Sequence, residues 1–422
     1  MSFGGKRVES RFEIEGGRKL FGKVRIKSAK NAVLPILAAS IMTEEESSIL
    51  DCPDITDVSA MTDILSLLGA KVERKDGTIM VSGEARVPEV PKELAVKMRS
   101  SVFLLGSLLA SCGHALLFKP GGCNIGARPI DIHIQGLRAL GVKITETEDS
   151  VVCDGSNMRA GDVTLKGVSV GATENMMTAS VFLKGRTVIR NAAREPEIVD
   201  LQNFLNASGA RIKGAGTSVI EIEGVKKLHG VTYLPIPDRI VAGTVMCAVA
   251  ACGGEAEIEN VRPEHLLSIT RKLQKSACQF GDSCANIVVS SCRRPKSFSV
   301  STGPYPRFPT DMQAQFMVVA AVAEGVSRIS ENLFETRFNH AAELEKLGAK
   351  IEIKKNVATV YGKEELFGAR LRCFDLRGGA ATIVAALAAK GKSEVFGIGH
   401  VDRGYEKFEN TLASLGAVIK RI

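Results

Sequence analysis

The phrase LSLLGAKVE at residues 65–73 recurs five more times along the chain, and the six copies decide the fold. The other copies are LRALGVKIT at 137–145, LNASGARIK at 205–213, LQKSACQFG at 273–281, LEKLGAKIE at 344–352 and LASLGAVIK at 412–420. Their aligned small residues are Gly69, Gly141, Gly209, Ala277, Gly348 and Gly416, at spacings of 72, 68, 68, 71 and 68. A period near 70 therefore fills the 422-residue chain six times.

Each copy has the pattern of an amphipathic helix that ends at a glycine C-cap and leads into a strand. A second helix recurs in every unit and is apolar on nearly all sides, as in KNAVLPILAASIM from Lys30 and RGGAATIVAALAA from Arg377. Such a helix must be buried, so the amphipathic helices and the strands have to cover it. The sequence thus predicts an α/β protein with buried central helices and six repeated units of about 70 residues.

The last unit stops at Ile422 without the strands that the others have, and RFEIEGGRKLFGKVRIK at 11–27 looks like those strands. The N-terminus should then pair with the C-terminal half. With three units per domain, we expect a first domain at 23–235 and a second built from 1–22 and 236–422.

Composition narrows the classes of function. The apolar fraction is 45% and the charged fraction 24%, which are ordinary values for a globular protein. The net charge of +8 is spread along the chain, and Trp is absent, so nucleic-acid binding is disfavoured; the positive excess suits a small anionic substrate. Without a long apolar run or a signal peptide, we expect no membrane contact and a cytoplasmic location.

The sequence gives no sign of a metal or a cofactor. Ten cysteines contain no C-x-x-C pair, the histidines are dispersed, and neither a Walker loop nor a dinucleotide fingerprint occurs. We therefore expect no metal ligands and no cofactor.

The buried helices start with charged residues, namely Lys30, Arg99, Arg239, Asp311 and Arg377. Basic residues oppose the helix dipole at an N-terminus unless an anion binds between them. If the helix ends of both domains face one cleft, they would form a site for a phosphorylated anion. The alternative is that these residues are solvent-facing ends or caps, and Asp311 after Thr310 fits an N-cap.

The second unit carries an extra-long loop, KPGGCNIGARPID at 119–131. A thiol at Cys123 near Lys119 and Arg128 would have a lowered pKa and could act as an acid or a nucleophile. The alternative is a bystander cysteine.

Nearly the entire chain resembles the UDP-N-acetylglucosamine 1-carboxyvinyltransferases, the enolpyruvyl transferases that open peptidoglycan synthesis. The resemblance is carried by the following motifs: Lys30-Asn31-Ala32 with LPILAA, PGGCNIGARPID at 120–131, SVGAT at 169–173, NAAREPEIVD at 191–200, PDRI at 237–240, FPTDMQAQF at 308–316, FETRFNH at 334–340, DLR at 375–377 and DRGYE at 402–406. It implies two inside-out α/β domains hinged over a cleft. It also implies transfer of the enolpyruvyl group of phosphoenolpyruvate to the 3′-hydroxyl of UDP-N-acetylglucosamine, without a redox cofactor.

The resemblance implies a role for each site residue. Cys123 would protonate the enolpyruvyl methylene, and Asp311 would be the base near the sugar hydroxyl. Lys30, Arg128 and Arg403 would hold the phosphate, with Arg337 and Arg377 on the carboxylate side. The nucleotide sugar would contact Asn31, Arg99, Arg128, Pro129, Ile130, Asp131, Ile132, Ser169, Val170 and the backbone of Leu333.

One position departs from the family. Many members have a lysine directly before the VSVG segment, whereas this chain has Gly167 there and Lys166 one residue earlier. We include both Lys166 and Gly167 in the expected nucleotide site.

Two alternatives stay open at this point. The sister transferase that acts on shikimate 3-phosphate shares the fold but lacks the cysteine loop. A non-catalytic nucleotide-sugar-binding relative would be expected to have lost Cys123, Asp311 or Arg403, and all three are present. The sequence does not indicate an oligomeric state.

Overall fold

The computed structural model describes residues 9–95, 98–119, 130–282 and 285–422. Over this part of the chain, the strands form six four-stranded sheets of one design. In each sheet an edge strand runs parallel to its neighbour, and the next two strands follow in antiparallel order. The six repeated units predicted from the sequence are thereby confirmed as an α/β fold.

Three sheets come from the N-terminal half. The first sheet has the order β14 (Thr232–Tyr233), β3 (Ser47–Ile49), β5 (Thr78–Ser82) and β4 (Lys71–Lys75). The second has the order β6 (Glu89–Val90), β7 (His114–Phe118), β9 (Ser150–Asp154) and β8 (Lys143–Glu146). The third has the order β10 (Asp162–Thr164), β11 (Arg186–Arg190), β13 (Val219–Glu223) and β12 (Arg211–Lys213).

The other three sheets belong to the C-terminal half. The first has the order β16 (Gln279–Asp282), β17 (Asn286–Ser291), β15 (Gly254–Glu259) and β2 (Leu20–Arg25). The second has the order β18 (Ser299–Ser301), β19 (Val326–Ser330), β21 (Val357–Tyr361) and β20 (Lys350–Lys354). The third has the order β22 (Arg370–Arg372), β23 (Gly391–Phe396), β1 (Arg11–Gly16) and β24 (Val418–Arg421).

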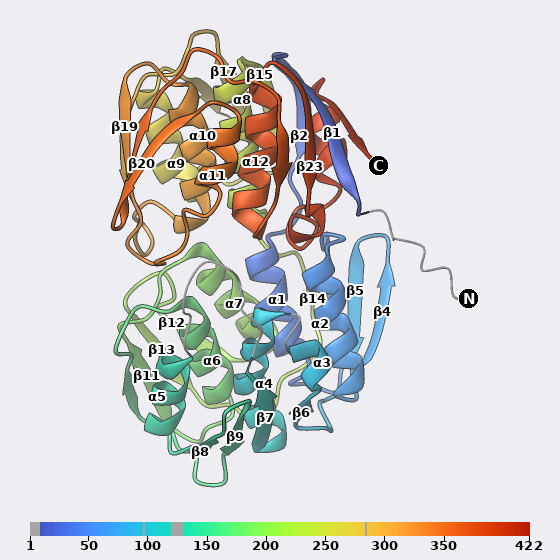
Figure 1. The fold of residues 1–422 in the computed structure, drawn as a ribbon. Coiled ribbons are helices and arrows are strands. Elements are labelled where there is room, and N and C mark those ends of the chain that lie inside the picture. Colours follow the sequence, from blue (N-terminus) through green and yellow to red (C-terminus); the bar gives the residue numbers. More distant parts are fainter. Residues whose placement is uncertain (1–8, 96–97, 120–129, 283–284) are drawn as a thin grey trace, which may run out of the picture.

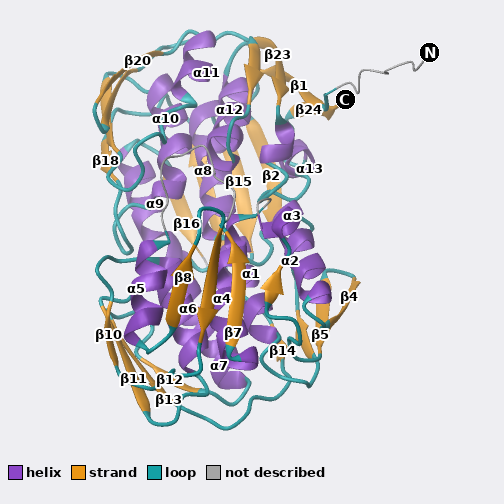
Figure 2. Ribbon diagram, turned by 60° about the horizontal axis from the view of Figure 1, so that its bottom comes forward, coloured by secondary structure: helices purple, strands orange, loops and turns teal. Residues whose placement is uncertain are grey.

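Helices fill the inside of each half and the sheets lie outside (Figure 2). The central helices are α1 (Lys30–Ser40), α4 (Leu104–Cys112), α6 (Val170–Ser180), α8 (Arg239–Cys252), α10 (Gln313–Val322) and α12 (Leu376–Ala388). In the C-terminal half α8, α10 and α12 all contact one another, and every residue of α10 is buried. The all-apolar pattern predicted this burial, because such a helix has no side that favours water.

The amphipathic helices are α2 (Thr56–Leu67), α5 (Asp131–Ala139), α7 (Pro196–Ala207), α9 (Pro263–Lys275), α11 (Ala341–Lys346) and α13 (Phe408–Ala413). They pack beside the central helices, as α2 and α7 do against α1 and α9 does against α8. Shorter pieces are α3 (Lys92–Ala95) and the 3₁₀ turns η1 (Arg99–Phe103), η2 (Thr310–Met312) and η3 (Ile398–His400).

The repeated phrase ends all six amphipathic helices in the same way. Each aligned small residue has a positive φ, between 75° at Ala277 and 107° at Gly69. The next N–H then donates to the carbonyl of the leucine that opens the phrase, as from Ala70 to Leu65 at 3.1 Å and from Ala210 to Leu205 at 2.9 Å. This is the Schellman arrangement, which turns the chain from the helix into the next strand.

The N-terminal strands lie in the C-terminal half, where Figure 1 shows β1 and β2 beside β23. β1 pairs with β23 and β24, and β2 pairs with β15 along its whole length. The boundary expected between residues 22 and 23 therefore falls inside β2. Because Val24 and Ile26 are buried in the core of the C-terminal half, we propose that this domain includes residues up to about 26.

Two chain segments connect the halves and run antiparallel beside each other. Ala29 N–H donates to the Ile236 carbonyl at 2.7 Å, and Asp238 N–H donates to the Lys27 carbonyl at 2.9 Å. Each half has its own large apolar core, one within residues 12–26 and 240–417 and the other within 33–228. We propose that these cores define the two domains.

In the described part of the chain, no helix is long and apolar enough to cross a membrane. The eight cysteines in that part are all unbridged, and Cys52, Cys153, Cys247, Cys278 and Cys373 are buried.

Strand β1 gives a direct test of how the N-terminus is used. Ile14 is 2% exposed, so Ile14→Ala should lower the free energy of unfolding by about 2–5 kcal/mol. Glu13→Ala, on the exposed face of the same strand, should change it by less than about 0.5 kcal/mol. Urea unfolding followed by circular dichroism measures both, and equal losses would mean that β1 is not a core strand.

Candidate active site

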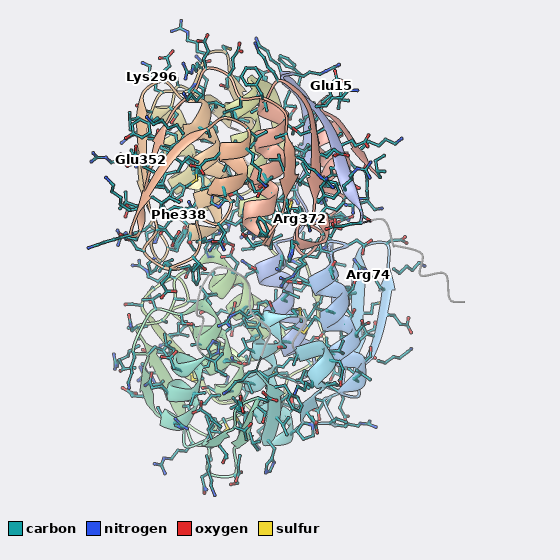
Figure 3. The ribbon with its side chains drawn as sticks, in the orientation of Figure 1. Glu15, Arg74, Lys296, Phe338, Glu352 and Arg372 are labelled. Carbon is teal, nitrogen blue, oxygen red and sulfur yellow. The ribbon has the colours of Figure 1, made fainter. Side chains whose placement is uncertain are left out.

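Charged residues at the starts of the central helices gather where the two halves meet. Figure 3 places Phe338, the neighbour of Arg337, at the end of the C-terminal half that faces the N-terminal half. Lys30 is the first residue of α1, and its N–H donates to the Asp238 carboxylate at 3.2 Å. Asp238 also caps α8 by accepting from Ile240 and Val241 at 2.8 and 2.9 Å. The connection between the halves is thus held against the start of two helices.

A buried carboxylate joins two cations of the expected phosphate site. Asp57, in the first turn of α2, accepts from Lys30 Nζ at 2.5 Å and from Arg403 Nε at 2.9 Å. Asp57 is 2% exposed. Burial would raise the pKa of its carboxyl, but Lys30 and Arg403 together bring it below the usual value. Lys30 and Arg403 come from opposite halves, so this group of charges lies across the interface.

Asp311 lies between two buried arginines. Its Oδ1 accepts from Arg337 Nη2 at 2.7 Å, and its Oδ2 accepts from Arg377 Nη2 at 3.1 Å. Although burial acts in the opposite direction, Arg377 and Arg337 hold the pKa of the Asp311 carboxyl well below its usual range. The carboxylate is therefore fully ionised, and it keeps both guanidinium groups in place.

The alternative interpretation of Asp311 as an N-cap is wrong. Asp311 is the middle residue of η2, no side chain caps that turn, and α10 starts only at Gln313. Its carboxylate instead takes the two arginines, which lie 26 and 66 residues away in sequence. Asp375 is a true cap, because it accepts from the N–H groups of Arg377 and Gly378.

Arg377 is held by both charge and an aromatic ring. Its guanidinium carbon lies 5.4 Å from the centre of the Tyr405 ring. Burial would lower the pKa of Arg377, but Tyr405 and Asp311 raise it above its usual value. Its Nη1 is buried without a hydrogen-bond partner in the described part of the chain. A donor of this kind is ready to bind an anion.

Glu331 organises the same side of the site, although the sequence did not indicate it. This carboxylate is 2% exposed and accepts from Thr302 and Thr310 at 3.0 and 2.8 Å. It also accepts from the N–H of Leu333 at 2.9 Å, while the Leu333 side chain is 41% exposed. Thr310 in turn accepts from Arg337 at 3.0 Å, so Glu331 links the Leu333 loop to the arginines.

A second ion pair crosses the interface. Arg239, at the start of α8, donates to both oxygens of Glu197 at 3.0 and 3.2 Å, and both side chains are buried. Beside them Glu174 is 2% exposed, and burial together with Glu197 and Glu195 raises its pKa well above the usual value. Burial thus favours the protonated form of the Glu174 carboxyl.

Apart from Leu333, the described residues that are expected to contact the nucleotide sugar lie in the N-terminal half. A Cβ added to Gly167 would lie 3.2 Å from Ile132, which brings the segments 130–132 and 166–170 together. Asp131 is the first residue of α5, Ile130 is buried, and the Ser169 hydroxyl caps α6 by accepting from Ala172. Lys166 is exposed, and its N–H donates to Gln135. Asn31 lies in α1 and Arg99 opens η1, both partly buried.

Three expected residues, Cys123, Arg128 and Pro129, lie outside the described residues. In the part that is described, no group of three His, Cys, Asp or Glu side chains could hold a metal ion. The described site is therefore a set of cations and paired carboxylates, suited to binding an anion with several negative oxygens.

Comparison with known proteins places this geometry in a family. The sequence model described as EPSP synthase (3-phosphoshikimate 1-carboxyvinyltransferase) matches residues 14–412. UDP-N-acetylglucosamine 1-carboxyvinyltransferase 2 of Caldanaerobacter subterraneus subsp. tengcongensis is 46% identical over 414 residues, which cover 98% of this chain and 99% of that protein. UDP-N-acetylglucosamine 1-carboxyvinyltransferase of Thermotoga maritima is 44% identical, with 97% and 98% covered.

Solved structures agree on the fold. The enolpyruvyl transferase NikO from Streptomyces tendae has a TM-score of 0.89 at 24% identity, and it covers 98% of this chain and 99% of its own. An EPSP synthase from Acinetobacter baumannii has a TM-score of 0.76 at 18% identity, with 98% and 100% covered. At such identities the likeness concerns the fold alone.

His340 is buried near Asp375. We expect it to make the stability of the protein depend on pH. Burial lowers the pKa of His340 to about 4, although Asp375 acts in the opposite direction. Between pH 6.5 and 4, His340 is therefore neutral in the folded protein, whereas the same side chain binds a proton in the unfolded chain. The stability from this group is present above pH 6.5 and is lost as the pH falls toward 4.

The measurement is the free energy of unfolding at several pH values for wild type and His340→Asn. Between pH 6.5 and 4 the wild type should lose up to about 1.4 kcal/mol per pH unit more than the variant. His114→Asn, at an exposed histidine, is the control and should keep the wild-type slope. Parallel curves for wild type and His340→Asn would disprove the burial effect.

Proposed function

The chain belongs to the enolpyruvyl transferase family, and on this premise we propose that it is a UDP-N-acetylglucosamine 1-carboxyvinyltransferase. It transfers the enolpyruvyl group of phosphoenolpyruvate to the 3′-hydroxyl of the nucleotide sugar and releases phosphate. The observation that carries this proposal is a pair of charge clusters near the junction of the halves. Lys30 and Arg403 meet on Asp57, and Arg337 and Arg377 meet on Asp311. Phosphoenolpyruvate carries a phosphate and a carboxylate, and these cations match both.

The relatives decide between the two acceptors. Proteins named for UDP-N-acetylglucosamine are 43–47% identical over nearly the full length of this chain. The solved EPSP synthases share only the fold, at 18% identity. We therefore favour the nucleotide sugar over shikimate 3-phosphate, and a catalytic protein over a binding-only relative. The reaction belongs to peptidoglycan synthesis, and we place it in the cytoplasm.

The chemistry is an addition followed by an elimination. In the addition, the sugar 3′-oxygen attacks C2 of phosphoenolpyruvate, C3 receives a proton and the hydroxyl proton is taken up by a base. In the elimination, phosphate leaves from C2 and C3 loses a proton, which restores the double bond. We assign proton donation to Cys123 and the acceptance of the hydroxyl proton to Asp311.

Asp311 must gain basicity before it can take that proton. Between Arg337 and Arg377 it is a weak base, because both guanidinium groups stabilise its negative charge. The carboxylate of phosphoenolpyruvate would compete for the same arginines, and Arg377 Nη1 has no partner in the described residues. Substrate binding would thus draw the arginines toward the substrate and raise the proton affinity of Asp311.

The remaining residues would bind and orient. Lys30 and Arg403, with Arg128, would hold the phosphate that leaves. Ile130, Ile132 and Ser169 with Val170 would form the uridine pocket, to which Asp131 and Pro129 contribute. Gly167 lies close against Ile132, and exposed Lys166 would reach the diphosphate. Asn31, Arg99 and the backbone at Leu333 would contact the sugar.

Acceptor-dependent phosphate release tests the proposed function. Wild-type protein with phosphoenolpyruvate should release phosphate when UDP-N-acetylglucosamine is added, and not when shikimate 3-phosphate is added. Release with shikimate 3-phosphate alone would select the sister reaction. No release with either acceptor, despite binding of the nucleotide sugar by calorimetry, would show a binding-only protein.

Asp311→Asn tests the proposed base. The variant keeps the size of the side chain but loses its proton affinity, so kcat should fall about 10²–10⁴-fold. The dissociation constant for UDP-N-acetylglucosamine should stay within about threefold, measured by calorimetry. Asp162→Asn, at an exposed carboxylate paired with Arg190, is the matched control and should keep the wild-type kcat. A kcat within twofold of wild type in Asp311→Asn would remove the role.

A further inference from the structure

We propose that Asp57 is a positioning residue that holds Lys30 and Arg403, from opposite halves, at the spacing that binds the phosphate of phosphoenolpyruvate. This inference rests on the proposed function. Asp57 lies outside every motif that carries the family resemblance, and neither composition nor spacing indicates it. It does not touch the reacting atoms in this account and acts through the two cations.

The first argument is geometry. Both carboxylate oxygens of Asp57 are used, since Oδ1 accepts from Arg403 Nε at 2.9 Å, and Oδ2 accepts from Lys30 Nζ at 2.5 Å and from Arg403 Nη2 at 3.4 Å. One small buried anion thus fixes the distance between an ammonium and a guanidinium. An ammonium has three N–H donors and a guanidinium has five, so Asp57 uses only part of the capacity of each.

The second argument is that the surroundings place Asp57 at the contact between the halves. The N–H of Thr56 donates to the Asp402 carbonyl at 3.0 Å, next to Arg403 in sequence. The N–H of Asp54 donates to the Glu406 carboxylate at 3.0 Å, and Lys27 lies 3.5 Å from the same carboxylate. The start of α2 therefore lies directly against residues 402–406. A displacement of either half would change the Lys30–Arg403 spacing through Asp57.

The third argument is charge. Lys30 faces Asp57 on α2, Arg403 after η3 and Arg377 on α12, and its own N–H meets Asp238 before α8. Burial lowers the pKa of Lys30, and Arg377 and Arg403 lower it further, while Asp57 raises it. Without Asp57, the buried Lys30 and the partly buried Arg403 would repel each other, and Lys30 would lose its proton more easily.

A competing interpretation makes the opposite prediction. If Asp57 only occupied the cations until substrate arrived, its removal would strengthen phosphate binding, because the site would become more positive. Under the positioning account, removal weakens phosphate binding in spite of the added positive charge. The sign of the change in phosphate affinity therefore separates the two interpretations.

The experiment compares wild type with Asp57→Asn, Asp57→Glu and Asp54→Asn. Asp54 is the matched control, since it is exposed, pairs with Arg74 and lies three residues away. The readouts are kcat and KM for phosphoenolpyruvate across pH, and the dissociation constant for inorganic phosphate by calorimetry. Melting temperatures identify any variant that is unfolded, in which case the other Asp57 variant carries the test.

In Asp57→Asn we expect KM for phosphoenolpyruvate and the dissociation constant for phosphate to rise at least tenfold, with a smaller change in kcat. The alkaline limb of kcat/KM should move to lower pH by about one unit or more. Asp57→Glu keeps the charge but moves it, so the alkaline limb should recover while the high KM stays. Asp54→Asn should match wild type.

Two results would overturn the inference: phosphate constants within twofold of wild type in the folded Asp57 variants, or tighter phosphate binding in Asp57→Asn. Failure of the proposed function looks different, since the wild type itself would then show no turnover with UDP-N-acetylglucosamine. In that case the dissociation constants for inorganic phosphate would still test whether Asp57 positions the two cations.

Discussion

The apolar surface of the central helices is the constraint on which the structure depends. Helices such as α10 and α12 have no polar side, so protein must cover them along their whole length, and sheets enclose them from outside. Only their ends can carry charge. Since the starts of α1, α8 and α12 reach the junction between the halves, Lys30, Arg239 and Arg377 lie there, beside helix N–H groups that donate to Asp238 and Asp375. The active-site charge therefore follows from how the cores are built.

A cluster of buried cations needs carboxylates to be stable in the absence of substrate. The carboxylates here are Asp57, Asp311 and Glu197. Each forms an ion pair with a cation that lies far away in the sequence. Asp57 and Glu197 pair across the two halves, so the same ion pairs that neutralise the site also join the domains. An anionic substrate that engages these cations would act on both the chemistry and the contact between the halves.

The repeated phrase and the apolar helices predicted the fold from short stretches of sequence. The site was harder to predict, because its side chains pair with residues far away in the sequence. Six Schellman turns follow from one phrase, including the turn at Ala277 where alanine replaces glycine. The helix starts and the motifs indicated Lys30, Asp311 and Arg377. The sequence could not indicate Asp57, because its partner Arg403 lies 346 residues away. The alternative of an N-cap at Asp311 was wrong for the same reason, since two distant arginines bind that carboxylate. The domain boundary that we propose near residue 26 lies a few residues after the expected one, because strand pairing places β2 in the C-terminal half.

The central claim is that cations from both halves and Asp311 surround an enolpyruvyl transfer to a nucleotide sugar. The most direct measurement is carbon NMR of the product formed from phosphoenolpyruvate labelled with ¹³C at C2, together with UDP-N-acetylglucosamine. The account predicts that the label appears as an enol-ether carbon bonded to O3 of the sugar, with one phosphate released per product. A label that stays in phosphoenolpyruvate, or that appears in free pyruvate while the sugar is unchanged, would contradict it.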